Sequence, residues 1–84
     1  MNKSILKKQI LYRSQHRGMK EMDLLLGRFV NKYIDSFTDI ELQELIIILN
    51  IDDEILYKWY LDKKDKGEFL KGNVAKKLKQ FKLK

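Results

Sequence analysis

The sequence has 84 residues, of which 44% are hydrophobic and 36% charged, and its formal net charge is +6. This length supports one small hydrophobic core, so it excludes two lobes around an enclosed cleft, and we expect a single domain over residues 1–84. The chain contains no cysteine, which excludes disulfides, thiolate nucleophiles and cysteine metal sites. With no proline and only four glycines it also lacks the usual turn residues of a sheet, so the composition predicts an all-α fold.

The first segment is basic: residues 1–20 hold six lysines or arginines and no acidic residue. Four apolar residues recur there at helical spacing and predict a helix over residues 3–16: Ile5, Leu6, Ile10 and Leu11. Its composition is superficially that of a mitochondrial presequence. The segment runs directly into residues 17–21, a stretch of conspicuous sequence that is described below, so its removal would cut into that stretch. We therefore interpret it as part of the fold and expect a cytoplasmic chain without a removable presequence.

The stretch around Gly18 joins this helix to the next. Basic and polar residues give way here to an apolar helical pattern, so we expect Gly18 to be the joint, where it is free to adopt a positive φ that other residues resist. A sustained i, i+3, i+4 pattern predicts the second helix over residues 18–34. Its apolar residues are Met22, Leu25, Leu26, Phe29, Val30, Tyr33 and Ile34.

Arg17 and Glu21 lie four residues apart, about one turn of this second helix. The carboxylate of Glu21 would also stand in the first turn, where unpaired backbone N–H groups favour negative charge. Spacing alone favours a local Arg17–Glu21 pair that stabilises the helix start over a binding site, because exposed charge pairs are common and weak.

A capping box predicts where the third helix begins, since the side chains of Thr38 and Glu41 can each accept the other residue's backbone N–H. The apolar run from Leu45 to Leu49 suits either a helix or a buried strand. The capping box and the lack of a partner strand favour the helix. Because its last residues are apolar on nearly every side, we expect this helix to run through the middle of the bundle.

The pattern in the second half of the sequence predicts two further helices, so we expect a bundle of about five helices. Asp52 is the expected N-cap of the fourth, with Asp53 beside it in the cap, and Trp59 lies on its apolar stripe. A charged connector follows over residues 62–67. Four apolar residues then predict a lysine-rich fifth helix over residues 68–83, weakened at its start by Gly72 and Asn73: Leu70, Val74, Leu78 and Phe81.

The charges are segregated: residues 1–20 carry +6, residues 21–54 carry −7 and residues 55–84 carry +7. These blocks either attract one another within the fold or orient a protein partner. The basic last helix also fits a nucleic-acid-binding protein, and more weakly a helix that touches an anionic membrane. Against nucleic acid, fifteen of the eighteen basic residues are lysine, and no helix carries a base-reading face.

Catalysis by this chain is not expected. An enzyme needs positioned nucleophiles, acid–base pairs or a cofactor site, whereas this chain has one histidine, no cysteine and no glycine-rich phosphate loop. We interpret His16 as a solvent-facing or interface residue and not as a catalyst or metal ligand.

The motif Arg17-Gly18-Met19-Lys20-Glu21, followed by Met22-Asp23 and an apolar helix, resembles the Arg-Gly-x-x-Glu signature of the small succinate dehydrogenase assembly factors that promote covalent flavin attachment. The similarity extends to the size, to Arg13-Ser14, to the Phe37-Thr38-Asp39 helix start and to the block over residues 56–61. The chain departs from the family at His16, where the family carries a second arginine.

The resemblance implies an assembly chaperone. Its partner would be the flavoprotein subunit of succinate dehydrogenase or fumarate reductase, whose own histidine becomes covalently joined to FAD, so this chain would bind no cofactor or metal of its own. The implied contact residues are Arg17, Gly18 and Glu21, with Asp23 supporting them and His16 beside them. A monomer is expected, with no nucleic-acid partner and no membrane insertion.

Overall fold

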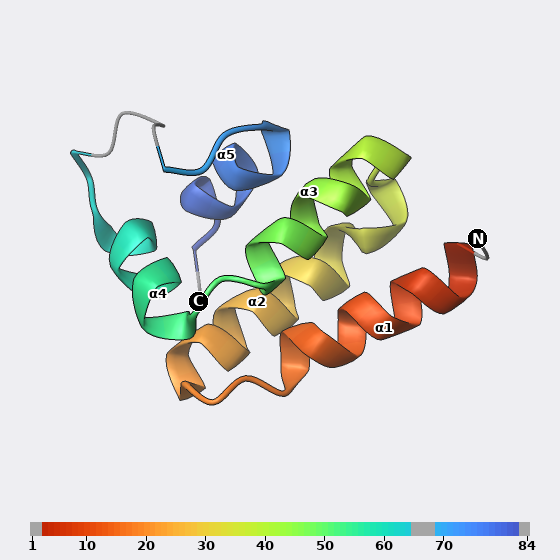
Figure 1. Cartoon of the computed structure of the whole chain (residues 1–84), viewed down its shortest axis with the longest axis horizontal. Coiled ribbons are helices and arrows are strands. Elements are labelled where there is room, and N and C mark those ends of the chain that lie inside the picture. Colours follow the sequence, from red (N-terminus) through yellow and green to blue (C-terminus); the bar gives the residue numbers. More distant parts are fainter. Residues whose placement is uncertain (1–2, 65–68, 83–84) are drawn as a thin grey trace.

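Five α-helices make up the fold in a computed structural model that describes residues 3–64 and 69–82 (Figure 1). They are α1 (Lys3–Gln15), α2 (Lys20–Tyr33), α3 (Asp39–Leu49), α4 (Asp53–Leu61) and α5 (Asn73–Gln80), and a 3-10 turn, η1 (Ile34–Ser36), follows α2. No strand occurs in the described ranges, so the predicted all-α bundle is confirmed. None of these helices is long and apolar enough to cross a membrane.

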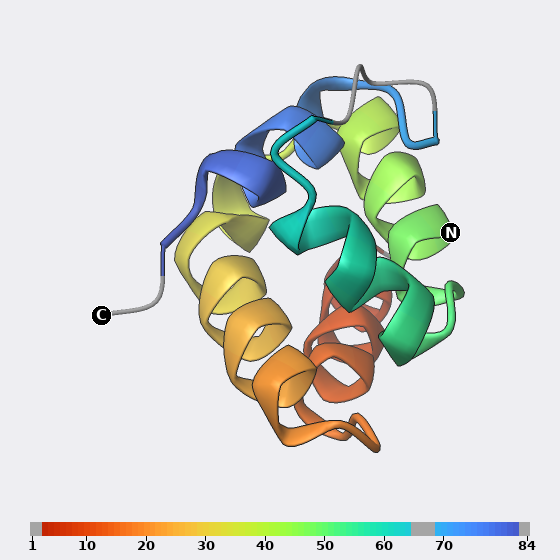
Figure 2. The same ribbon diagram turned by 90° about the vertical axis from the view of Figure 1, so that its left-hand side faces the viewer.

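The most buried helix is α2, whose apolar stripe faces the centre of the bundle. Its buried residues are Met22, Leu25, Leu26, Gly27, Phe29 and Val30. α1 packs along α2, and α5 lies on the opposite side of the bundle from α1, next to α3 (Figure 2). Because α2 is covered from several directions, its position fixes both the loop that precedes it and the turn that follows it.

The third helix begins as predicted, because both hydrogen bonds of the Thr38–Glu41 capping box form. The segment from Leu45 to Leu49 is helical, which resolves the choice between helix and strand. The prediction that α3 runs through the middle of the bundle is wrong: Ile40 and Ile47 are 74% and 60% exposed. One face of α3 packs on the core, and branched apolar residues on its other face remain in solvent.

The fifth helix is shorter than the predicted span of residues 68–83, whose two end residues lie outside the described ranges. It begins at Asn73, directly after Gly72, which has a φ of 106°. A side chain from α3 fixes this start, since Glu44 Oε1 accepts the backbone N–H of Val74 at 3.1 Å. Leu70 and Phe81 lie beyond the helix ends but still pack against the core. Of the predicted connector, residues 65–67 lie outside the described ranges.

Candidate functional site

The Arg-Gly motif forms the connection between α1 and α2, residues 16–19. The joint therefore lies where the change of sequence pattern predicted it. Gly18 does not use the positive φ that is open to glycine, because Gly72 is the one residue in the described ranges with a positive φ. The chain turns at residues 16–19 through ordinary backbone conformations.

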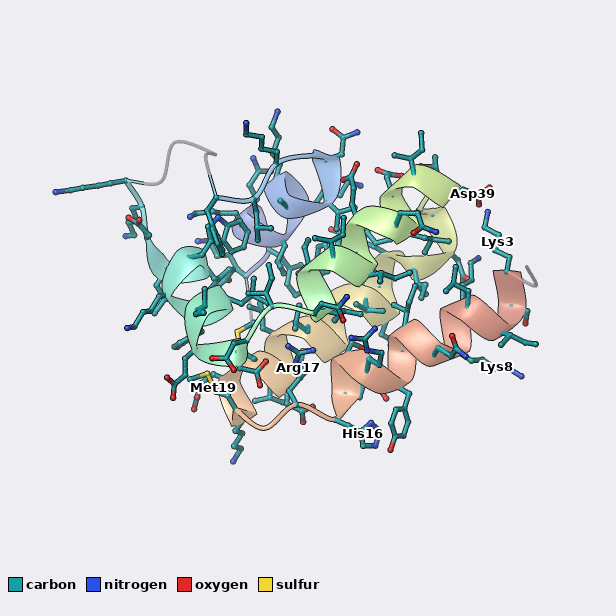
Figure 3. The ribbon with its side chains drawn as sticks, viewed as in Figure 1. Lys3, Lys8, His16, Arg17, Met19 and Asp39 are labelled. Atoms are coloured by element: carbon teal, nitrogen blue, oxygen red, sulfur yellow. The ribbon has the colours of Figure 1, made fainter. Side chains whose placement is uncertain are left out.

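The side chain of Arg17 points inward from this connection (Figure 3) and binds the junction between α3 and α4. Its Nε donates to Asp53 Oδ1 at 2.7 Å, and a second guanidinium nitrogen lies 2.6 Å from the same oxygen. The guanidinium also donates to the backbone carbonyls of Leu49 at 2.8 Å and Ile51 at 3.1 Å. The C-terminal end of a helix presents such free carbonyls and attracts a cation. The two charged side chains are only 10% and 16% exposed.

Two backbone N–H groups of the connection are bound by carboxylates as well. Asp23 Oδ1 accepts the N–H of Arg17, and Asp53 Oδ2 accepts the N–H of Met19, each at 3.2 Å. Asp53 lies in the first turn of α4, as predicted, but its carboxylate binds Arg17 and Met19. Asp52 occupies the N-cap position of α4, but its side chain makes no capping hydrogen bond.

The local pair between Arg17 and Glu21 that spacing alone favoured does not form, because the guanidinium of Arg17 binds Asp53. Glu21 lies in the first turn of α2 with an exposed side chain. Gly18 is exposed too, and a Cβ added to it would meet its nearest neighbouring atom, Asp53 Oδ2, at 4.0 Å, an ordinary contact distance. Neither backbone conformation nor space within the chain requires glycine at this position.

His16 lies at the edge of the molecule, beside a tyrosine ring (Figure 3). Its Nδ1–H donates to the backbone carbonyl of Tyr12 at 2.7 Å, and the two rings stack with their centroids 3.9 Å apart. Both side chains are exposed, as expected for a solvent-facing or interface residue. The structure therefore brings Arg17, Gly18 and Asp23 together and places His16 and Glu21 on the outer surface of the same connection.

A shallow hollow of about 280 Å³ lies beside the connection, between α1 and α2, lined by Gln15, Asp23, Leu24, Gly27, Arg28 and Asn31. α1 and α2 lie close together there, because a Cβ added at Gly27 would lie 3.4 Å from Gln15 Cγ and 3.7 Å from the backbone oxygen of Ser14. Within the described ranges no group of three or more histidine, acidic or cysteine residues could hold a metal ion. The arrangement is thus an exposed, internally braced protein surface.

Comparison with known proteins gives consistent matches. The family model described as the flavinator of succinate dehydrogenase matches residues 8–82. The chain is 37% identical over 71 residues to succinate dehydrogenase assembly factor 2, mitochondrial, from Dictyostelium discoideum, a match that covers 84% of this chain and 50% of that protein. It is 32% identical over 79 residues to the protein of the same name from Danio rerio, covering 92% and 50% of the two chains.

A third match, to the protein of the same name from Arabidopsis thaliana, has 34% identity over 65 residues and covers 77% of this chain and 35% of that protein. The chain thus spans about half or less of these curated relatives. No solved structure matches it significantly.

Proposed function

Because the chain belongs to the family described as flavinators of succinate dehydrogenase, we propose that it is an assembly chaperone that binds the flavoprotein subunit of succinate dehydrogenase or fumarate reductase and promotes covalent attachment of FAD. The family supports a role in assembly and not in catalysis by this chain. The cytoplasmic location stays a prediction, and the relatives above carry "mitochondrial" in their names.

The observation that carries the proposal is the braced α1–α2 connection. Gly18 exposes its backbone to solvent, although no contact within the chain requires a glycine at this position. Glu21 is also exposed and follows three residues later. An exposed glycine lets another protein's backbone approach closely. On the inner side of the connection, the ion pair between Arg17 and Asp53 fixes its position. Since the connection is already ordered, it would lose little conformational entropy when a partner binds it.

The contact residues then have different roles. Gly18 and Glu21 would touch the partner, with His16 at the rim of the contact. Arg17 and Asp23 are positioning residues, because their polar groups are engaged within the chain. This assignment changes the expectation from the sequence resemblance, in which Arg17 was itself a contact residue.

The proposed mechanism is orientation. Joining FAD to a histidine of the flavoprotein requires that histidine, the flavin methyl group and a base inside the flavoprotein to be aligned. A small rigid bundle promotes such a reaction by favouring the flavoprotein conformation in which the groups are aligned. No residue of this chain enters the chemistry, and FAD stays bound to the partner.

The test mixes the purified chain with apo-flavoprotein and FAD and measures protein-bound flavin fluorescence on a denaturing gel. We expect Glu21→Ala and Gly18→Arg to lose both flavoprotein pull-down and flavin attachment, while circular dichroism shows a helical, cooperatively unfolding protein. Asp39→Ala is the matched control. Asp39 is also an exposed carboxylate in the first turn of a helix, and it lies at the far end of the molecule (Figure 3).

Gly18→Ala separates the two explanations for this glycine. The added methyl group has room, so the unfolding free energy of the Gly18→Ala protein should differ from that of the wild type by less than about 1 kcal/mol. Reduced partner binding would then reflect the close approach of the partner. Full binding by a folded Glu21→Ala protein would contradict the proposed contact.

A further inference from the structure

Three ion pairs join the first basic block of the chain to its acidic middle. Lys3–Asp39, Lys7–Asp35 and Arg17–Asp53 all connect the basic residues 1–20 with the acidic residues 21–54. The attraction between these two blocks that was expected from the sequence therefore exists. Within residues 3–64 and 69–82, Lys77 and Lys82 of the last block form no ion pair.

Lys77 and Lys82 line one groove together with Lys32 of the middle block. It has a volume of about 530 Å³, lies between the end of α2 and the end of α5, and is lined by Lys32, Tyr33, Lys77, Gln80, Phe81 and Lys82. We call it the lysine groove. Its lining contains three ammonium groups and no carboxylate, and none of the three forms an ion pair in the described part of the chain.

Aromatic rings hold two of these ammonium groups in place. Lys32 Nζ lies 5.4 Å from the ring centroid of Tyr33 and 5.9 Å from that of Phe81, and Lys77 Nζ lies 4.9 Å from the Tyr33 ring. The rings themselves are fixed, because Tyr33 and Phe81 both pack edge-on or tilted against neighbouring aromatic rings. Cation–π contacts restrain a flexible lysine without neutralising it. The groove therefore presents positive charge in a partly ordered arrangement.

We propose that the lysine groove binds an acidic segment of a partner protein, with carboxylates against Lys32, Lys77 and Lys82 and an apolar side chain beside Phe81. Charge complementarity selects the acidic partner. The proposal does not depend on the flavoprotein contact: the groove lies at the C-terminal end of α2 and the Arg-Gly connection at its N-terminal end.

A nucleic acid fits the groove less well. Proteins that bind single strands stack bases on exposed aromatic faces, whereas the ring of Tyr33 is already approached by Lys32 and Lys77. The groove also lacks arginine, whose planar fork suits phosphate and base edges. A compact ammonium group is sufficient for carboxylates.

The experiment titrates the whole chain with an octaglutamate peptide at physiological salt and monitors binding by the changes in amide chemical shifts in NMR spectra. We expect saturable binding with the largest shifts at Lys32, Lys77 and Lys82. The combined change of these three lysines to Gln should weaken binding about tenfold or more, since several charged contacts are lost together. The control changes Lys8, Lys58 and Lys71 to Gln. These three are exposed lysines outside the groove, so the net charge of the two variants is equal and affinity should change less than about twofold.

Four results would overturn the proposal. Equal weakening in the control variant would show a response to net charge alone. Shifts spread over all exposed lysines in the wild-type chain would show that no defined groove exists, and this measurement needs no variant to fold. Tighter binding of a single-stranded oligothymidylate through the same residues would identify a nucleic-acid site. A dimer in sedimentation that the groove variant abolishes would identify a second copy of this chain as the occupant.

Discussion

Arg17 is a positioning residue whose contacts lie far away in the sequence. It binds one carboxylate and two backbone carbonyls at the α3–α4 junction, and both charged side chains are largely buried. A charge removed from water is stabilised only if its partners remain in place. The motif arginine therefore contributes first to the fold, and through the fold to the shape of the exposed connection.

Changing Asp53 to Ala should lower the free energy of unfolding by about 3 to 5 kcal/mol, because the guanidinium of Arg17 would stay buried without its counter-ion. Urea denaturation measures the change. The control is Asp52→Ala, since Asp52 is an exposed neighbour whose side chain makes no capping hydrogen bond, and it should cost less than about 1 kcal/mol. Equal effects of the two changes would contradict the assigned role of Asp53.

The sequence could predict part of this site. The position of the α1–α2 connection follows from a local change of pattern, and it is correct. The partner of Arg17 could not be found that way, because Asp53 lies 36 residues further along the chain and stands in an acidic run that local rules assign to a helix cap. Contacts of this kind depend on how two loops meet in space.

At the level of elements, α3 shows how composition alone misplaces a helix. Its run of branched apolar residues suggested burial on all sides, yet Ile47 is 60% exposed and Leu49 only 3%. The capping box fixed the start of the helix correctly because it is a local signal. Which face turns inward depends on α1, α2 and α5, and the run itself contains no polar residue to mark the outer face.

Truncating Leu49 to Ala should therefore cost about 2 to 5 kcal/mol, because it leaves a cavity in the core. Truncating Ile47 to Ala on the same helix should change the free energy of unfolding by no more than about 1 kcal/mol, because its side chain is mostly in solvent. Thermal melting of both variants provides the comparison. An unchanged midpoint for Leu49→Ala would place this residue outside the core.

Tyr60 attaches the segment after α5 to α4, because its hydroxyl donates to the backbone carbonyl of Phe81. Burial raises the pKa of Tyr60 above its ordinary value of about 10, with a smaller contribution from Tyr57. Above that ordinary value the unfolded chain releases the proton while the folded chain retains it. Rising pH then favours unfolding, and the contribution disappears once the pH passes the folded-state pKa.

We expect the difference in unfolding free energy between the wild type and Tyr60→Phe to be constant below pH 10 and to shrink above it. Urea denaturation of the two proteins across this range measures the difference, and the comparison removes the titration of lysines, which both share. A difference that does not vary with pH would contradict the raised pKa of Tyr60.

On the scale of the whole molecule, the fold uses its charges unequally. Three ion pairs join the first basic block to the acidic middle, but the pairs of Lys3 and Lys7 involve carboxylates that are 85% and 93% exposed. Such pairs contribute little to stability and are screened by salt. Lys77 and Lys82 of the last block contribute positive charge to the lysine groove. The composition shows the excess of lysine but not where these side chains meet in space.

The bracing of the α1–α2 connection also has a consequence for amide hydrogen exchange. The N–H groups of Arg17 and Met19 are held by carboxylates at 3.2 Å, so exchange at either requires the loop and the start of α2 or α4 to separate. Gly18, between them, has no hydrogen-bond partner for its amide in the described ranges. We expect NMR-detected exchange to be slow at Arg17 and Met19 and fast at Gly18, and equally fast exchange at all three would contradict the bracing. A short exposed connection would then open together with the helices around it and not as an independent loop.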